Sequence, residues 1–480
     1  MHKRRQAAVK AALKRYWSVN QGDATRDARL QQTLVGQNLM LIDSLETFWI
    51  MGMTKEFEEA VAAITRMDLA PHGQITNLLQ TTRLLSALLS AHDFTKCGDT
   101  RLLSKAVELG DMLFTFFDTP NHIPVTSWNS TKVANSEEQE PSRHATLTEL
   151  TSYNLAFTRL SQLTGDMRYY DAVKRVTTIL ASQQNSTRIP GLWPTDMNPQ
   201  SLDLTSNNTF SLEVQSSPAA YAQYGLMTRL LTVSPTASPY MAISTNALDA
   251  ITQHLLFRPI TPTNASILMA SSAYTTPQGR ITRTHTIDAS SCALGSTLAF
   301  AATLTRNDTY LTYARLVTEG CIWTSLHAPP VSSTTDNFNM MPSSFSMLAC
   351  SSADLSESDE DCTFNPDVWW EQKYPGFETI RDETRVRIRP ELAMSLFTLY
   401  RVTGEERWRN IGWQLWEGIQ RAMESLTQPT SANARTDEEE FKSTMQSLKH
   451  FYLLFSETDM LSLDKWVFGG DGSVLWAGSP

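Results

Sequence analysis

Helical periodicity dominates the pattern of apolar and polar residues along this chain. Leu and Ala recur at spacings of three and four residues in 77–96, 145–163, 294–305, 388–403 and 443–455. This spacing is typical of amphipathic helices that bury one face. Alternating, strand-like patterns are scarce, and we count about fourteen helical segments separated by short polar breaks. The pattern therefore predicts an all-α protein.

A weak internal repeat connects several of these segments. A helix is followed by a break that contains Gly or Asn, and then by a polar cap and an aromatic helix start, at 164–169, 305–310 and 403–408, with a shorter copy at 97–100. Gly or Asn can end a helix in the left-handed conformation, and Asp, Glu or Thr can cap the next one. Repeated helical hairpins are typical of solenoids and closed toroids. The uneven spacing favours a toroid.

A long stretch rich in Ser, Thr, Pro and Asp interrupts the periodicity at 327–387, and a shorter polar loop is expected at 427–437. A loop of the first length is usually functional or disordered. Cys350 and Cys362 lie within it. A disulfide between them would constrain the loop, and two unpaired thiols are the alternative.

Composition narrows the class of protein. The chain has 480 residues and a formal net charge of −10, with 41% hydrophobic and 19% charged residues, which is enough chain for a large core. An acidic chain is poorly suited to coating nucleic acid, because such binding depends on Lys and Arg at the phosphates. No run of eighteen apolar residues occurs, so no membrane span is expected. We expect an acidic, globular monomer.

Cysteines and glycosylation sequons bear on the compartment. The five cysteines form no C-x-x-C pair, which argues against zinc-ribbon and thioredoxin chemistry. Five N-x-S/T sequons mildly favour the secretory route; they lie at Asn129, Asn185, Asn207, Asn264 and Asn307. No signal peptide is visible, because an amphipathic segment follows the basic start. We expect the secretory lumen or secretion after trimming of a targeting segment, with the cytoplasm as the alternative.

Several motifs occur in an order that resembles one enzyme family. Residues 41–53 are similar to IDALDTLWIMGL, 83–92 to RILGGLLSAY, and 148–166 to AEVTS followed by LTGD. Residues 191–194 are similar to GLxP, 389–401 to RPETxESLFYLYR, and 448–468 to LKYLYLLFS followed by LSLDxxVF. These are motifs of glycoside hydrolase family 47, the class I α-1,2-mannosidases. The resemblance implies one (α/α)7 barrel domain over 1–480 with 327–387 as an inserted loop. It also implies a disulfide between Cys292 and Cys321.

The family's chemistry identifies candidate acids in this chain. Inverting glycosidases need a carboxylic acid for the leaving oxygen and a carboxylate that activates water. By the resemblance, Glu391 is the candidate general base, with Arg389 beside it, and Asp43 and Glu149 are candidate acids of the sugar subsite. The alternatives are that Glu391 forms a salt bridge with Arg389 or Arg387, and that Asp43 and Glu149 are packing acids bound to backbone donors.

Other functional positions of the family carry different residues here. The family's acid falls on Leu79, or on Gln80 if one residue is deleted, and neither is a carboxylic acid. The glutamate three residues after the base is Met394, and the histidine of HLxCF is Ala289. In the motif ESFxxxET the first glutamate is retained as Glu440, but the glutamate nearest the sugar is Gln446. These side chains would line a less polar pocket.

The resemblance also implies a calcium ion at the base of the barrel, and calcium takes six to eight oxygen ligands. The threonine of FNTEAHP, whose hydroxyl and carbonyl bind that ion in the family, is Gly470 here. We therefore expect the calcium site to be lost and expect no cofactor, although Asp471 follows directly and is a candidate ligand-binding residue.

Three hypotheses follow. The first is a pseudoenzyme that binds an oligomannose glycan or a glycoprotein without cleaving it. The second is an enzyme repurposed for cyclisation, elimination or isomerisation of a small, less polar, natural-product-like substrate, with Glu391 or Asp43 as proton donor or acceptor. The third is a residual α-mannosidase with another metal site around Asp471. Ordinary calcium-dependent α-1,2-mannose hydrolysis is not expected, and whether the chain is an enzyme stays open.

Overall fold

A computed structural model describes most of the chain. The described residues are 1–30, 40–67, 74–75, 78–135, 137, 139–210, 239–284, 286–327, 340–350, 362–365, 378–379, 387–426, 438–470 and 472–478. Among the described helices, none combines the length and apolarity that a bilayer crossing requires.

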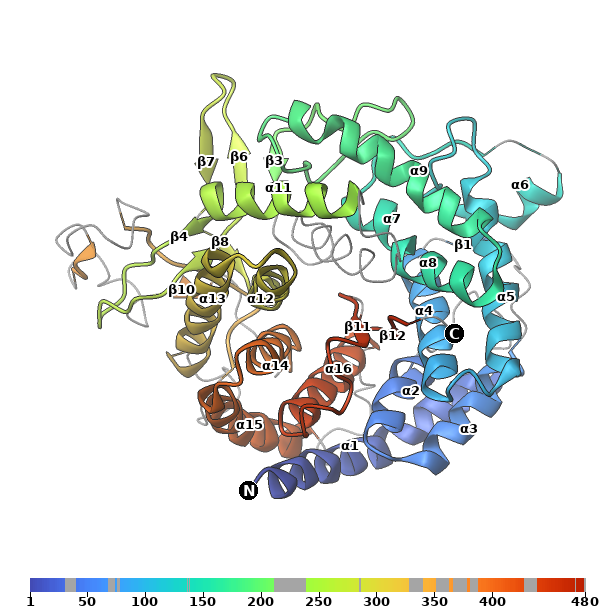
Figure 1. Ribbon diagram of the computed structural model, residues 1–480, viewed down its shortest axis with the longest axis horizontal. Helices are drawn as coiled ribbons and strands as arrows, with labels where there is room; N and C mark the ends of the chain where they lie inside the picture. Colours follow the sequence, from blue (N-terminus) through green and yellow to red (C-terminus); the bar gives the residue numbers. More distant parts are fainter. Residues whose placement is uncertain are drawn as a thin grey trace.

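Helices form two concentric rings (Figure 1). The outer helices are α1 (His2–Leu30), α3 (Thr54–Ile64), α5 (Thr100–Phe114), α9 (Arg168–Gln183), α11 (Pro239–His254), α13 (Asp308–His327) and α15 (Glu406–Leu426). The inner helices are α2 (Met40–Ile50), α4 (Leu78–Phe94), α8 (Tyr153–Thr164), α12 (Leu294–Thr305), α14 (Glu391–Thr403) and α16 (Glu438–Leu454). Shorter helices in the connections are η1 (Thr115–Phe117), α6 (Ser130–Ala134), α7 (Leu147–Thr151), η2 (Gln184–Ser186) and η3 (Ala289–Ala293). The described outer and inner helices alternate along the chain except at α9 and α11, two outer helices between which residues 211–238 lie outside the described residues. This is the predicted (α/α)7 barrel.

The chemistry predicted for the breaks between helices explains their ends. Gly165 and Gly404 end α8 and α14 in the left-handed conformation, with φ of 75° and 70°. In the third repeat the left-handed residue is Arg306, at φ 54°, so the expectation that the Gly or Asn of the break takes this conformation is wrong for this repeat. The Asn307 side chain instead accepts a backbone N–H at the start of α13. Asp99 caps α5 in the same way.

The two ends of the barrel differ in their connections. Each inner helix except α16, which is followed by the strands β11 (Trp466–Phe468) and β12 (Val474–Trp476), leads through a short turn into an outer helix, for example over 51–53, 165–167 and 404–405. The inner helices therefore run in one direction, and all of them begin at the opposite end, where the connections are longer. We call this the long-loop end. Every predicted acid near an inner-helix N-terminus must lie there.

A C-terminal hairpin, β11 (Trp466–Phe468) paired with β12 (Val474–Trp476), lies at the centre of the rings (Figure 1). Two buried carboxylates hold it. Glu46 of α2 accepts the Val474 N–H at 2.9 Å and pairs with Lys449 Nζ at 2.7 Å. Because the partners come from α2, α16 and β12, this contact joins both ends of the chain.

The second anchor of the hairpin is Asp93 near the end of α4. Its Oδ2 accepts the Trp476 N–H at 2.8 Å, while Arg159 Nη2 of α8 lies 2.6 Å from Oδ1. Neither the Asp93 nor the Arg159 side chain is exposed to solvent. Arg159 also donates to the Gly478 carbonyl. Each member of the ion pair therefore has a further hydrogen bond to the backbone of the C-terminal segment.

The remaining strands are two or three residues long and pair antiparallel. They are β1 (Gln74–Ile75), β2 (Trp128–Asn129), β3 (Thr209–Phe210), β4 (Leu256–Phe257), β5 (Met269–Ala270), β6 (Ala273–Thr275), β7 (Ile281–Arg283), β8 (Thr286–Asp288), β9 (Ser344–Ser346) and β10 (Glu378–Thr379). Strand β9 pairs with both β8 and β10. Part of the predicted inserted loop 327–387 therefore adds a sheet beside η3, while the predicted loop 427–437 lies outside the described residues.

Both expected disulfides are confirmed. Cys292 of η3 is bonded to Cys321 of α13, with Cα atoms 6.0 Å apart. Cys350 is bonded to Cys362 within the inserted segment, with Cα atoms 4.9 Å apart. The Cys97 thiol is free and half-buried.

Candidate functional site

The predicted acids each lie near the start of an inner helix, at the long-loop end. Asp43 lies in the first turn of α2, Glu149 lies in α7 directly before α8, and Glu391 is the first residue of α14. Leu79 and Gln80 belong to the first turn of α4, but their side chains lie outside the described residues, and so does Asp471.

Asp43 is engaged in a buried ion pair. Arg83 Nε of α4 lies 3.0 Å from Asp43 Oδ1, and Arg83 Nη2 reaches Glu438 Oε1 of α16 at 3.4 Å. Burial raises the pKa of Asp43, while the positive charge of Arg83 acts in the opposite direction. This cluster of three residues clamps the N-termini of α2, α4 and α16.

Glu149 takes part in helix capping. Its Oε2 accepts the Thr146 backbone N–H at 2.7 Å and the Thr146 hydroxyl at 2.9 Å. The Thr146 hydroxyl in turn accepts the Glu149 N–H, which completes a capping box. It explains why the helix predicted over 145–163 begins at Leu147. The carboxylate thus binds a backbone donor, which was the alternative reading of this residue.

Glu391 differs from the other two acids. Its Oε2 is buried and has no hydrogen-bond partner among the described residues. Burial raises the pKa of Glu391, opposed by its own backbone N–H and by the positive charge of Arg389. The structure does not pair this oxygen with Arg389 or Arg387. A buried acceptor without a partner is rare in folded proteins, and it is a natural contact for a ligand donor.

A cavity of about 40 Å³ adjoins Glu391. Its walls combine polar and apolar groups, including Ala289, Met341, Arg387, Arg389 and Phe451. One water occupies roughly 10–15 Å³ on this measure, so the cavity has room for a few waters. Arg389 and Glu391 therefore line one cavity, and the small side chain of Ala289 lines it too.

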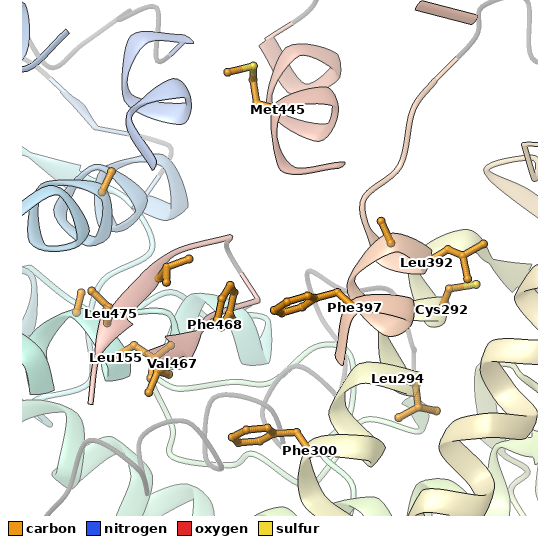
Figure 2. Close-up of a cluster of buried hydrophobic side chains, with 14 of the residues drawn as sticks. Leu155, Cys292, Leu294, Phe300, Leu392, Phe397, Met445, Val467, Phe468 and Leu475 are labelled. Carbon is orange, nitrogen blue, oxygen red and sulfur yellow. The ribbon is translucent and has the colours of Figure 1, made fainter. Parts of the chain in front are cut away.

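Met394, one turn after Glu391, faces a second cavity of about 10 Å³ in the barrel interior. Aromatic rings dominate its walls: Figure 2 shows Phe397 and Phe468 pointing toward one another, with ring centroids 5.1 Å apart. His450 also lines it. Burial, and then the charge of Lys449, lower the pKa of His450 to about 3. The imidazole is therefore neutral, and the groups that line this cavity are mainly apolar, with the hydroxyls of Ser296 and Thr398 as the exceptions.

Gln446 lies against the turn of the hairpin. Gly472 has φ +91°, and a Cβ at this position would overlap the Gln446 amide nitrogen. Lys449 donates to the Gly472 carbonyl. The structure thus brings together Gln446 and the hairpin turn that carries Gly470, two positions that the resemblance assigns to one site.

The described residues at this turn do not fit a calcium ion. Gly470 offers no side-chain oxygen, and the Lys449 ammonium, next to the Gly472 carbonyl, would repel a divalent cation. Among the described residues, no group of three or more His, Cys, Asp or Glu side chains could hold a metal ion.

Sequence reasoning missed several charged residues of this end, above all Lys442. Its side chain is 15% exposed, and Nζ lies 3.6 Å from Glu439 Oε1. The positions 438, 442, 446 and 449 follow the i, i+4 and i+3 spacing of one helix face. That spacing is visible in the sequence and could have identified Lys442 as a neighbour of Gln446.

Comparisons with known proteins agree with this architecture. The sequence profile described as glycosyl hydrolase family 47 matches residues 17–477. The human endoplasmic reticulum mannosyl-oligosaccharide 1,2-alpha-mannosidase is 27% identical over 92% of this chain, and the match covers 58% of that protein. An Arabidopsis thaliana mannosyl-oligosaccharide 1,2-alpha-mannosidase is 25% identical over 98% of this chain and 79% of its own length.

A solved structure supports the same fold. The alpha-1,2-mannosidase from Trichoderma reesei superposes with a TM-score of 0.78 at 20% identity, covering 99% of both chains. At this identity the likeness concerns the fold alone. The chain spans about three fifths of the length of the human, rat and mouse relatives that it matches.

Proposed function

Because this chain belongs to glycosyl hydrolase family 47, we propose that it binds an oligomannose-type glycan, free or on a glycoprotein, without hydrolysing it. The names of the relatives, which are mannosyl-oligosaccharide mannosidases, supply the ligand class. The residues of the long-loop end supply the reason for binding without cleavage.

The observation that carries the proposal is the Glu391 carboxylate. Its Oε2 is buried without a hydrogen-bond partner among the described residues, and leaving a buried acceptor unsatisfied costs about 1–3 kcal/mol. A sugar hydroxyl is a donor that would satisfy it. The retained Glu391 therefore suits a hydroxyl-rich ligand, and the adjoining cavity of about 40 Å³ has room for a hydroxyl group and a few waters.

Hydrolysis requires a second carboxyl group, because an inverting glycosidase uses one as acid and one as base. Leu79 and Gln80 cannot serve, and Asp43 is held by Arg83. Glu149 is held by the Thr146 backbone. The misfit to calcium at the hairpin turn removes the other source of transition-state stabilisation that the family uses.

The proposed location is the lumen of the secretory pathway. The human relative is named for the endoplasmic reticulum, and the two disulfides are of a kind that persists in oxidising compartments. A glycoprotein ligand is available in the same lumen.

Calorimetric titration with an α-1,2-linked oligomannose, in EDTA, tests the proposal. We expect saturable binding without mannose release, and about a tenfold or larger loss of affinity in Glu391→Gln, since a hydrogen bond to a charged group is lost. Glu424→Gln, on the outer helix α15, is the matched control and should bind normally. Calcium-dependent release of mannose would refute the proposal in favour of a residual mannosidase.

A second function, acid–base chemistry on a less polar substrate, is favoured by one observation. The interior cavity is walled by Phe300, Met394, Phe397 and Phe468 beside the neutral His450, and Glu391 has the raised pKa of a potential proton donor. Absence of oligomannose binding, together with turnover of a less polar substrate that Glu391→Gln abolishes, would favour this function.

A further inference from the structure

We infer that Asn185 and Asn264 are modified by N-linked glycans, so that the long-loop end of the barrel carries two sugar chains of its own. These asparagines belong to two of the five N-x-S/T sequons of the sequence, and ligand binding at Glu391 gives none of the five a role. The inference rests on the proposed location in the secretory pathway, because sequons are modified in secreted proteins. It does not depend on oligomannose binding.

Exposure in the folded protein separates the five sequons. An N-linked glycan is bulky and hydrophilic and has to stay in water, so its asparagine must lie at the surface. Asn185 and Asn264 are exposed. The asparagines of the other three sequons are half-buried, namely Asn129, Asn207 and Asn307. A glycan on one of these three would have to displace neighbouring groups of the fold.

The three half-buried asparagines also serve the local backbone. Asn129 Oδ1 accepts the Thr131 N–H at 2.9 Å. Asn207 Oδ1 accepts the Thr209 N–H at 3.2 Å. Asn307 makes the same contact, at 3.0 Å, where α13 begins. Each of these side chains is thereby folded back onto the chain two residues ahead, which is the geometry of an Asx turn.

Asn185 projects from a turn that other residues hold in place. The Gly191 N–H donates to the Gln184 carbonyl at 3.1 Å, and the Gln184 side chain donates to the Ile243 carbonyl of α11 at 2.9 Å. None of the side-chain hydrogen bonds of this described turn involves Asn185. Its amide nitrogen can therefore carry a glycan without the loss of any of these contacts.

Asn264 lies in an exposed tight turn that leads toward β5. Its N–H donates to the Thr261 carbonyl at 3.0 Å, and its φ of 49° is a left-handed conformation that asparagine tolerates better than most residues. Arg258 Nη2 donates to Asn264 Oδ1 at 2.9 Å. Because a guanidinium only donates, this bond fixes the amide oxygen on the protein side and leaves Nδ2 for the sugar.

The connectivity of the barrel places both asparagines at the same end. Helix α9 starts after the short turn 165–167, so Asn185, which follows its last residue closely, lies at the long-loop end. Asn264 lies between α11 and α12, an inner helix, and inner helices begin at that end. The sequon at Asn307 is in the short turn between α12 and α13, at the opposite end. The two glycans thus stand at the end where Glu391 lies.

The modification is a group transfer that needs only a sugar donor. The asparagine Nδ2 forms a bond to the anomeric carbon of an oligosaccharide, and the bond from that carbon to a lipid-linked pyrophosphate breaks. One N–H proton is lost, and the pyrophosphate leaves with the bonding electron pair, so nothing is oxidised or reduced. The lipid-linked donor and the transferase belong to the secretory pathway of eukaryotic cells.

The test is secretion of the full chain from cultured eukaryotic cells behind a cleavable signal sequence, followed by mass spectrometry. Peptide N-glycosidase converts each glycosylated asparagine to aspartate, which identifies the occupied sites. We expect Asn185→Gln and Asn264→Gln each to lose one of two glycans. Ser266→Ala removes the sequon of Asn264 but keeps the Arg258 contact, and it should lose the same glycan. Asn307→Gln is the matched control and should keep both glycans.

Unmodified Asn185 or Asn264 in the secreted protein would overturn the inference, and so would full occupancy of Asn307, because exposure would then not select the sites. Oligomannose binding is measured on the same protein by calorimetric titration. If both glycans are present and oligomannose does not bind, the proposed function fails and the inference stands. If oligomannose binds and the two asparagines are unmodified, the inference fails and the proposed function stands.

Discussion

Two groups of buried carboxylates in this barrel are treated in opposite ways. Glu46 and Asp93, which hold the central hairpin, are each paired with a basic side chain and also accept a backbone N–H. Glu391, at the long-loop end, has an oxygen with no partner among the described residues. The carboxylates that hold the hairpin have their hydrogen-bond partners within the fold. Glu391 Oε2 lacks such a partner, which costs folding free energy until an external donor binds to it.

The largest effect is expected from breaking a saturated pair. Asp93→Asn keeps the shape of the side chain but leaves the fully buried Arg159 charge unpaired, which should lower the free energy of unfolding by about 3–5 kcal/mol. Urea denaturation measures it. The matched control is Asp111→Asn, which removes an exposed contact to Arg168 and should cost about 1 kcal/mol or less. Equal losses in the two variants would contradict the contrast.

A smaller effect is expected from the hairpin turn. Gly472→Ala places a side chain at φ +91°, against the Gln446 amide. The left-handed backbone should cost about 1–2 kcal/mol, with some relief if Gln446 moves aside. Thermal unfolding of Gly472→Ala and of Gly472→Ala with Gln446→Ala separates the backbone cost from the contact. Gly279→Ala, at φ +78° with nothing near its Cβ, is the control for backbone cost alone.

Glu391→Gln should stabilise the protein, whereas the substitutions of Asp93 and Gly472 should destabilise it. Because it removes a buried charge with an unsatisfied oxygen, we expect the free energy of unfolding at neutral pH to rise by about 1 kcal/mol while glycan affinity falls. Urea denaturation in the absence of glycan is the measurement. A loss of stability as large as that in Asp93→Asn would show that Glu391 is part of the scaffold.

The smallest effect is the pH dependence of the difference in unfolding free energy between Glu391→Gln and wild type. Burial raises the pKa of Glu391 in the folded state, so between the unfolded and folded values the folded state binds more protons. The stability contributed by Glu391 is therefore present at low pH and falls as pH rises through this window. The advantage of Glu391→Gln over wild type should vanish near about pH 4 and grow above it. An advantage that shrinks with rising pH would contradict the assignment.

Local patterns explain why the fold was predictable. Helices α4, α12 and α16 follow apolar periodicity, and Gly165 and Gly404 are residues for which the left-handed conformation carries no Cβ penalty. The left-handed conformation of Arg306 could not be predicted. Helix α12 ends at Thr305, so the residue after it is Arg306 and not Asn307, and an arginine gives no local sign of positive φ.

The sequence predicted which residues form the site better than it predicted the ion-pair and hydrogen-bond partners of those residues. The resemblance predicts that Glu391, Arg389 and Asp43 belong to one site, and the starts of α2 and α14, where they lie, are both at the long-loop end. The pairing of Asp43 with Arg83 depends on helices distant in sequence meeting across the barrel, which no local pattern encodes. The Glu149 cap could have been recognised, because Thr146 three residues earlier forms the T-x-x-E signature of a capping box.

The central hairpin has a consequence for biosynthesis. Val474 and Glu46 are 428 residues apart in sequence, and Trp476 and Asp93 are 383 residues apart. Until residues 466–478 leave the ribosome, the carboxylates of α2 and α4 lack the backbone donors that the finished barrel gives them. Contacts of such long range form late and slowly. Before the hairpin is in place, each of the two carboxylates has only its basic partner, Lys449 for Glu46 and Arg159 for Asp93.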